Sequence, residues 1–243
     1  MRIVFLIPRA LALVLVCGLT ACATPSVESL AENDPWEDTN RDTFAFNMWV
    51  ERHIAKPVVE AYRDVVPEPA RDGLHNAVTN LRAPVVLAND VLQGHPKKAV
   101  QTVARVLLNS TIGIGGLFDV ASRIGIPYHD NDFGITLGVA GAPEGSYLML
   151  PILGAKPPRD LLGMGVDGIF DPFTWSHFPG RHELLTARSG VNILDTADRT
   201  LDQIDEIERS SIDFYASTRS LYRQSRAAQI RGENPLFQNL PDL

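Results

Sequence analysis

Proline interrupts this chain too often for any long straight helix or continuous central strand. The chain has 17 prolines in 243 residues, and several of them stand directly before a stretch in which apolar residues recur at helical spacing. Proline fixes its own φ and lacks a backbone N–H, so it suits the first turn of a helix and disrupts helix interiors and central strands. The sequence therefore predicts many short, bent helices.

The stretches between the prolines indicate where these helices lie. In chain order we expect a segment capped by Asp38 or Thr39 and ending before Pro57, then Val58–Val66, a segment from Pro69 interrupted at Pro84, Val85–Leu92, a segment opened by Pro96, a segment around Arg159–Val166, and a long pattern from about Leu184 to Arg231. Four arginines near the end of that last pattern are placed to interact favourably with the helix dipole. They are Arg219, Arg223, Arg226 and Arg231.

The middle of the chain is rich in glycine. Twelve of the 18 glycines lie between Gly113 and Gly168, so the backbone must turn or be approached closely there. Short strands are conceivable at 133–139 and at 147–150, but neither is long enough for a sheet domain. The expected fold class is mainly α, with a glycine-rich hairpin and few or no strands.

The N-terminus has the features of an export signal. Residues 1–21 combine two arginines with a short apolar stretch, and Leu19-Thr20-Ala21-Cys22 resembles the bacterial lipobox, in which the cysteine is acylated after cleavage. An ordinary secretory signal with a chance cysteine is the alternative. Ala23 lacks the acidic side chain that marks inner-membrane retention in enteric bacteria, which favours the outer membrane. We expect a tether at 22–33, one helical domain at 34–231 and a flexible tail at 232–243.

The composition excludes several classes of protein. A formal charge of −7, which becomes −9 after cleavage, argues against nucleic-acid binding. The two cysteines and the scattered histidines form no metal motif, and no GxSxG element surrounds a serine. Asp132-Phe133-Gly134 matches a kinase triplet without the other kinase motifs. We therefore expect no enzyme activity, no metal and no cofactor.

The apolar segment from Ile112 to Phe118 has two interpretations. It follows a helix directly and carries no charge, so it is compatible with a helix C-cap that folds back into a core. It is equally compatible with an amphipathic hairpin that lies against lipid. The three tryptophans also have two interpretations, since they suit either a core or a membrane interface.

Motifs along most of the chain resemble the MlaA (VacJ) family of outer-membrane phospholipid-transport lipoproteins. The matching residues, in order, are Asn33-Asp34-Pro35-Trp36-Glu37, Asn40-Arg41, Phe44-Ala45-Phe46-Asn47, Tyr62-Arg63, Val66-Pro67-Glu68-Pro69-Ala70-Arg71, Asn80-Leu81, Pro84, Leu92-Gln93-Gly94, Arg105, Leu108-Asn109-Ser110, Gly113-Ile114-Gly115-Gly116, Asp119-Val120-Ala121, Asp132-Phe133-Gly134-Ile135-Thr136-Leu137-Gly138, Leu150-Pro151-Ile152-Leu153-Gly154 and Arg159-Asp160. They extend from about Asn33 to Thr186, and beyond that only length and helicity match.

The resemblance implies a ring-like helical protein that lies in the inner, periplasmic leaflet of the outer membrane, anchored by lipidated Cys22. It implies transport of mislocalised phospholipids to a periplasmic phospholipid carrier, beside a trimeric porin. The family's channel hairpin falls on Leu107, Ile112, Gly113, Ile114, Gly115, Gly116, Leu117 and Phe118. A family segment that affects transport falls on Asn40, Phe44, Phe46 and Asn47.

Two other functions remain open at this point. One is an envelope scaffold that binds porins without moving lipid, and the other is a lipid hydrolase, for which no nucleophile is evident. A transport channel needs a polar path for the headgroup and apolar outer walls for the acyl tails. Because the chain is acidic, we expect headgroup capture to depend on shape and apolar contact more than on basic side chains.

Overall fold

The computed structural model describes residues 26–233. The expected signal peptide, Cys22 and residues 234–243 of the expected tail lie outside the described residues. The elements, in chain order, are α2 (Val27–Ala31), α3 (Glu37–Val50), the π-helix η2 (Glu51–Ala55), α4 (Lys56–Val65), α5 (Glu68–Leu92), α6 (Pro96–Thr111), α7 (Val120–Arg123), α8 (Phe133–Val139), β1 (Met149–Leu150), β2 (Gly154–Ala155), α9 (Pro158–Phe170), α10 (Pro172–Trp175), α11 (Arg181–Ser210) and α12 (Phe214–Ile230). The expected mainly helical class is confirmed.

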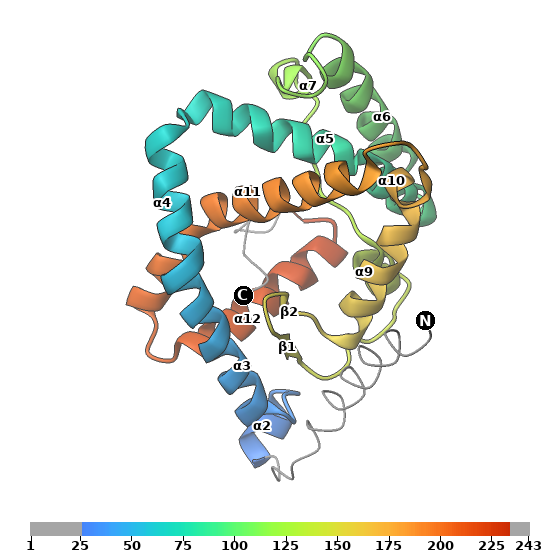
Figure 1. The fold of residues 1–243 in the computed structure, drawn as a ribbon. Helices are drawn as coiled ribbons and strands as arrows, with labels where there is room; N and C mark the ends of the chain where they lie inside the picture. The colour runs from blue at the N-terminus through green and yellow to red at the C-terminus, as the bar shows by residue number, and fades with distance from the viewer. Residues whose placement is uncertain (1–25, 234–243) are drawn as a thin grey trace, which may run out of the picture.

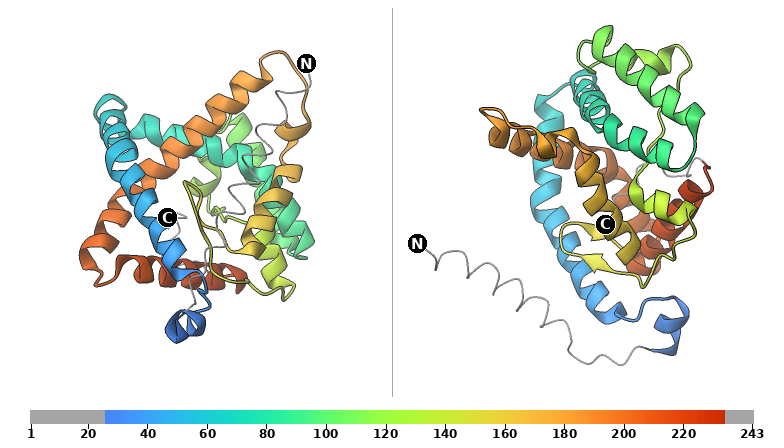
Figure 2. Two further views of the ribbon diagram at one scale, coloured as in Figure 1. Left: turned by 60° about the horizontal axis from the view of Figure 1, so that its bottom comes forward. Right: turned by 90° about the vertical axis from the view of Figure 1, so that its right-hand side faces the viewer.

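The helices form a frame around the small hairpin. In Figure 1, α3 and α4 run along one edge, α5 turns away from the end of α4, and α11 lies alongside α5. Figure 2 shows α12 returning at an angle from the end of α11. Helix α6 packs alongside α5, and α7 contacts α6. None of the helices in the described part of the chain is both long enough and apolar enough to cross a membrane.

Proline occupies the first turn of α4, α5, α6, α9 and α10, as the sequence predicts for α5 and α6. Two prolines were expected to break helices and do not. Pro57 follows the π-turn η2, which shifts the hydrogen-bond register, so α3 continues into α4. Pro84 lies inside the uninterrupted α5. Its neighbours Ala83, Val85 and Val86 are buried, and that packing outweighs the lost backbone hydrogen bond.

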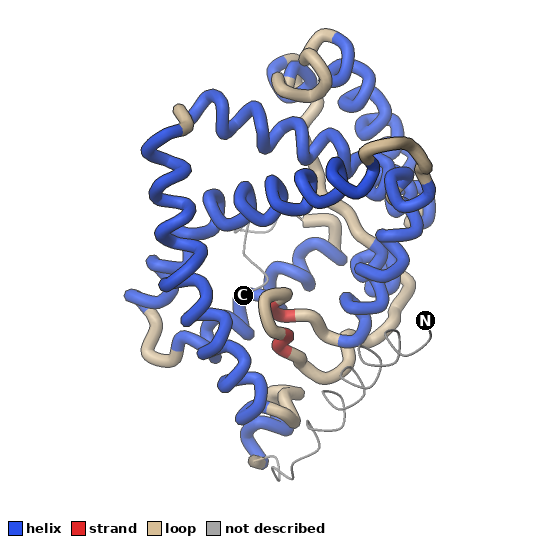
Figure 3. The backbone as a smooth tube through the Cα atoms, in the orientation of Figure 1, coloured by secondary structure: helices blue, strands red, loops and turns tan. Residues whose placement is uncertain are grey.

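The segment 133–139 is a helix rather than a possible strand. Asp132 caps it, since the Oδ1 atom accepts a hydrogen bond from the Ile135 N–H at 2.8 Å. A strand does form within 147–150, where Met149 and Leu150 pair antiparallel with Ala155 and Gly154. Figure 3 shows these strands as one short hairpin among helices and loops.

The long C-terminal pattern consists of two helices. Ser211 has an extended backbone, and Asp213 begins α12 by accepting a hydrogen bond from the Ala216 N–H at 3.0 Å. The expected tether is also partly folded, because α2 lies within it and Ser29 is buried.

The principal core lies where α3, the β-hairpin and the two C-terminal helices meet. Its buried members are Phe44, Met48, Tyr147, Met149, Ala155, Ile204, Tyr215 and Tyr222. The ring of Phe44 packs edge-on against Tyr215, with the ring centroids 5.6 Å apart. This core joins the helices near the start of the described chain to the helices near its end.

Candidate functional site

A cavity of about 760 Å³ lies among α3, α5, α9, α11, α12 and the loop of the β-hairpin. This volume corresponds to on the order of 25 water molecules. The wall contains six acidic and four basic side chains among the described residues, namely Glu51, Arg82, Asp130, Asp132, Lys156, Asp160, Asp167, Asp171, Arg188 and Arg226. Such a concentration of charge requires either water or ion pairing inside the cavity.

Arg226 of α12 is the centre of the largest ion-pair cluster in the wall. Its Nη1 atom donates to Asp132 Oδ2 at 2.7 Å, and its Nη2 atom donates to Asp160 Oδ1 at 3.0 Å. Burial alone would raise the pKa of the Asp132 carboxyl, but the charge and hydrogen bonds of Arg226 lower that pKa to about 2. The cluster therefore stays ionised at neutral pH and holds α9 and α12 together.

Two further carboxylates follow Asp160 along the cavity face of α9. Asp171 Oδ2 accepts a hydrogen bond from Arg188 Nη1 of α11 at 2.6 Å. Asp167 Oδ1 accepts hydrogen bonds from Asn89 Nδ2 at 2.9 Å and from the backbone N–H of Phe133 at 3.0 Å. Burial raises the pKa of the Asp167 carboxyl to about 6. The cavity face of α9 thus presents carboxylates that are held by ion pairs or by hydrogen bonds.

The expected transport-affecting segment of α3 supports one rim of the cavity. Asn40 is buried, and its side chain bonds to the backbone of the β-hairpin, at the carbonyl of Tyr147 (3.1 Å) and the N–H of Met149 (2.9 Å). Asn47 lines the cavity and accepts a hydrogen bond from the N–H of Ile152 at 2.8 Å. Phe44 lies in the core, whereas Phe46 is exposed.

The glycine-rich hairpin between α6 and α7 is a tight turn with an apolar exterior. Positive φ angles occur at Ile114, Gly115 and Gly116, and for the β-branched Ile114 such an angle is strained. The side chain of Asn80 on α5 holds the turn through Ser110 Oγ at 2.9 Å. Exposed apolar side chains cover the outside of this hairpin and its flanking helix; they are Leu107, Ile112, Ile114, Leu117 and Phe118.

The predicted hairpin residues are close to one another, but they do not line the 760 Å³ cavity, whose wall among the described residues includes only Asn47 from the predicted set. The sequence did not point to Arg82, Lys156 or Arg226 as residues of a site, and Asp160 was indicated only as part of a family motif. One usable signal was present, because residues 160 and 167 are seven apart and so share one face of a helix, although the predicted helix ended near Val166.

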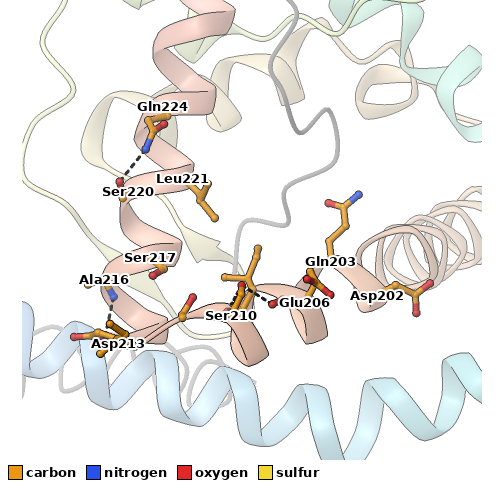
Figure 4. A pocket seen from close by; sticks show the side chains of 13 residues that line it. Asp202, Gln203, Glu206, Ser210, Asp213, Ala216, Ser217, Ser220, Leu221 and Gln224 are labelled. Atoms are coloured by element: carbon orange, nitrogen blue, oxygen red, sulfur yellow. Dashed lines mark hydrogen bonds between the residues drawn. The ribbon is translucent and has the colours of Figure 1, made fainter.

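A second hollow of about 1000 Å³ lies in the elbow between α11 and α12 (Figure 4). Gln224 and Ser220 form a hydrogen bond across its side at 2.9 Å, and Ile212 at the tip of the elbow is fully exposed. The buried ion pair of Arg226 with Asp160 lies in the first cavity and not in this hollow. No group of His, Cys, Asp and Glu within residues 26–233 is arranged to hold a metal ion.

The outer surface contrasts with the charged cavity. Large apolar side chains are exposed along α6 and α9, including Val100 (69%), Leu162 (67%) and Ile169 (55%). Exposed apolar surface of this extent marks a site that contacts lipid or another protein. The fold and the site together define a class of helical protein with a charge-bearing cavity and with large apolar side chains exposed along its outer helices.

Comparison with known proteins identifies the family within that class. Residues 32–229 match the MlaA lipoprotein family. The chain is 33% identical over 234 residues to the intermembrane phospholipid transport system lipoprotein MlaA of Escherichia coli (strain K12), covering 92% of this chain and 91% of that protein. The chain belongs to the MlaA lipoprotein family.

Other relatives and a solved structure agree with this membership. The MlaA protein of Haemophilus influenzae is 34% identical over 219 residues, covering 88% of this chain and 86% of its own length. A solved structure concerned with the structural basis for maintenance of bacterial outer membrane lipid asymmetry superposes with a TM-score of 0.72 at 32% identity. It covers 81% of this chain and 98% of the other. The resemblance seen in the sequence motifs is confirmed.

Proposed function

We propose that this protein removes mislocalised phospholipids from the outer leaflet of the outer membrane and passes them to a periplasmic carrier, which maintains lipid asymmetry. The relatives are named for intermembrane phospholipid transport, and the solved structure concerns outer-membrane lipid asymmetry. The observation that carries the proposal for this chain is the charged cavity inside a fold with apolar outer helices.

The physical basis is the cost of moving a charged headgroup through hydrocarbon. An unpaired charge at the centre of a bilayer costs several kcal/mol or more, so a phospholipid crosses slowly without help. A water-filled cavity with charged walls lets the headgroup stay hydrated, while apolar outer surfaces leave the acyl tails in lipid. Such a route needs no covalent step, and the relatives are named for transport rather than for a catalysed reaction.

We infer that the helices close into a ring around the cavity and lie within the periplasmic leaflet. Exposed side chains of α6 and α9 supply the apolar outer face, and an acylated Cys22 would add a covalent anchor. A trimeric porin is the expected neighbour in the membrane. The hairpin of residues 112–118, which lies outside the cavity wall, then acts on the channel through α5, to which Asn80 ties it. The α3 segment around Asn40 and Asn47 sets the shape of one rim.

The experiment is a gene deletion complemented with the wild-type chain or with a hairpin variant. Loss of the protein should increase outer-leaflet phospholipid and reduce tolerance to detergent, and the wild-type chain should restore both. An unchanged outer leaflet in the deletion strain would contradict the transport function.

The hairpin variant distinguishes a transport channel from an envelope scaffold that moves no lipid. A Cβ at Gly116 would lie 2.8 Å from Asn80 Cβ, at a φ of +95°. Gly116→Val should therefore distort the hairpin and fail to restore lipid asymmetry, although the protein reaches the membrane in normal amount. Gly190→Ala is the matched control, since nothing lies within 4 Å of its Cβ position. Full restoration by Gly116→Val would favour the scaffold.

A further inference from the structure

The short helix α2 turns its apolar face away from the rest of the domain. Val27 and Leu30 are three residues apart on one side of this helix, and they are 88% and 55% exposed. Ser29, on the side turned toward the domain, is buried. Glu28 and Glu32 are one turn apart and exposed on the flank between these two sides. Helix α2 is therefore amphipathic, with its apolar face outward.

The turn after α2 is fixed to the core of the domain. Asp34 is fully buried, and its Oδ2 atom accepts a hydrogen bond from Arg219 Nη1 of α12 at 2.7 Å. Its Oδ1 atom accepts a hydrogen bond from Asn40 Nδ2 of α3, also at 2.7 Å. The side chain of Asn33 donates to the carbonyl of Gly145 at 2.7 Å. These contacts hold α2 in a set position relative to α3 and α12, which both contribute to the cavity wall.

The chain between the expected lipid anchor and α2 is short. Three residues separate Cys22 from Ser26, the first residue that the structure describes. Because a chain spans at most about 3.5 Å per residue, Ser26 lies within about 14 Å of an acylated Cys22. Half of the hydrocarbon core of a bilayer is about 15 Å thick. Acylation of Cys22 therefore brings α2, which lies at one end of the molecule in Figure 1 and Figure 2, to the membrane surface.

We propose that α2 is an interfacial helix that inserts Val27 and Leu30 into the periplasmic leaflet beside the acyl chains of Cys22. The proposal rests on the function proposed above, which places the acylated protein in that leaflet. An amphipathic helix lies in the plane of the interface with its apolar face among the acyl chains and its charged residues toward the headgroups. The exposed flank with Glu28 and Glu32 then remains at the level of headgroups and water.

The interfacial helix sets the depth and the tilt of the cavity in the membrane. Acyl chains alone hold a protein at the bilayer, but they leave it free to rotate about its attachment. Because Asp34 joins the turn after α2 to α3 and α12, insertion of α2 fixes two walls of the cavity relative to the leaflet. Trp36, which precedes α3, is 48% exposed and suits the same boundary between water and lipid.

The experiment measures the environment of single fluorescent labels on the full acylated protein in nanodiscs of phosphatidylethanolamine and phosphatidylglycerol. The chain has two cysteines, of which signal cleavage removes Cys17 and acylation consumes the thiol of Cys22, so an introduced cysteine is the one reactive thiol. A label at Val27→Cys should be quenched by nitroxide-bearing phospholipid about threefold more strongly than a label at Glu28→Cys, the matched control. Aqueous iodide should quench them in the opposite order. Both positions are exposed, so the labels should not disturb the fold.

Two results would overturn the interfacial helix. One is equal quenching of the labels at positions 27 and 28 by iodide, which would place both in water. The other is protection of the label at position 27 from both quenchers, which would mean that protein, such as a second copy of this chain, covers the apolar face. A second pair, Leu30→Cys and Glu32→Cys, should repeat the result of the first pair.

A reference label at Leu162→Cys, on the outer face of α9, separates this inference from the proposed function. If that label reports lipid while the label at position 27 reports water, the interfacial helix is wrong and the proposed placement in the leaflet stands. If both labels report water, the proposed placement fails as well. Labelling of the wild-type protein would show a free thiol at Cys22, which would remove the lipid anchor and overturn the inference with it.

Discussion

At the scale of single residues, the cavity wall is organised by ion pairs that join different elements. Arg226 connects α12 to Asp160 on α9, and Arg188 connects α11 to Asp171 at the end of α9. Removing one partner of a buried pair costs about 3–5 kcal/mol because the other charge is left uncompensated. These side chains therefore keep the cavity polar and at the same time fix the helices that surround it.

Asp167 is a carboxylate of the cavity wall whose ionisation opposes folding. Its folded pKa of about 6 lies above the ordinary aspartate value of 3.8, so between these two pH values the folded state holds a proton that the unfolded state releases. This contribution to stability is fully present below about pH 4 and is lost as the pH rises toward 6.

Asp167→Asn should raise the free energy of unfolding at pH 7.5 by about 1–2 kcal/mol, after allowance for water in the cavity. Thermal melting of both proteins at pH 4 and pH 7.5 measures this difference. A variant that is less stable than wild type at pH 7.5 would show that Asp167 is held ionised instead.

At the scale of elements, close backbone contact decides how α8 and α9 pack. A Cβ at Gly163 would lie 2.3 Å from the backbone nitrogen of Gly134 and 2.8 Å from its Cα. Backbone atoms cannot move aside as a flexible side chain can, so this pair of helices depends on the absence of a side chain at 163.

The corresponding prediction compares two glycines of the same helix. Gly163→Ala should destabilise the fold by about 3 kcal/mol or more, because it forces α9 away from α8. Gly165→Ala, where nothing lies within 4 Å of the Cβ position, should stabilise it by about 0.5–1 kcal/mol through helix propensity. Chemical denaturation in detergent would measure both. Equal effects of the two substitutions would contradict the packing.

The elements also show which parts of the fold follow from local sequence. Pro69 and Pro96 indicated where α5 and α6 begin, because the preference of proline for the first turn of a helix depends only on neighbouring residues. The continuation of α5 through Pro84 depends on buried neighbours that lie far away in the sequence, and the π-turn before Pro57 has no local signal. The segment 133–139 alternates apolar and small residues like a strand, yet capping by Asp132 and contact with α9 make it a helix.

The candidate site was less predictable than the fold for the same reason. Arg219 and Arg226 were interpreted as favourable to the helix dipole, whereas they bind Asp34 and Asp160, which are 185 and 66 residues away. Nothing in the spacing of α12 indicates these partners. The family motifs, by contrast, identified Asn40 and Asn47, whose side chains hold the β-hairpin against α3.

At the scale of the whole molecule, the chain separates polar and apolar surface in an unusual way. Charged groups gather around an internal cavity, and large apolar groups are exposed along α6, the hairpin and α9. Together with the apolar core around Phe44 and Tyr215, this arrangement differs from that of a water-soluble domain in the apolar side chains exposed along whole helices. It is the arrangement that lets headgroups and acyl tails follow different paths past the same protein.

Photo-cross-linking with two phospholipid probes in a bilayer tests this separation most directly. One probe carries its reactive group in the headgroup and the other at the end of an acyl chain. The headgroup probe should label the cavity wall around Thr196 on α11, and the acyl probe should label the outer face around Leu162 on α9. Labelling of the outer face by both probes, with the cavity left unlabelled, would contradict the passage of headgroups through the cavity.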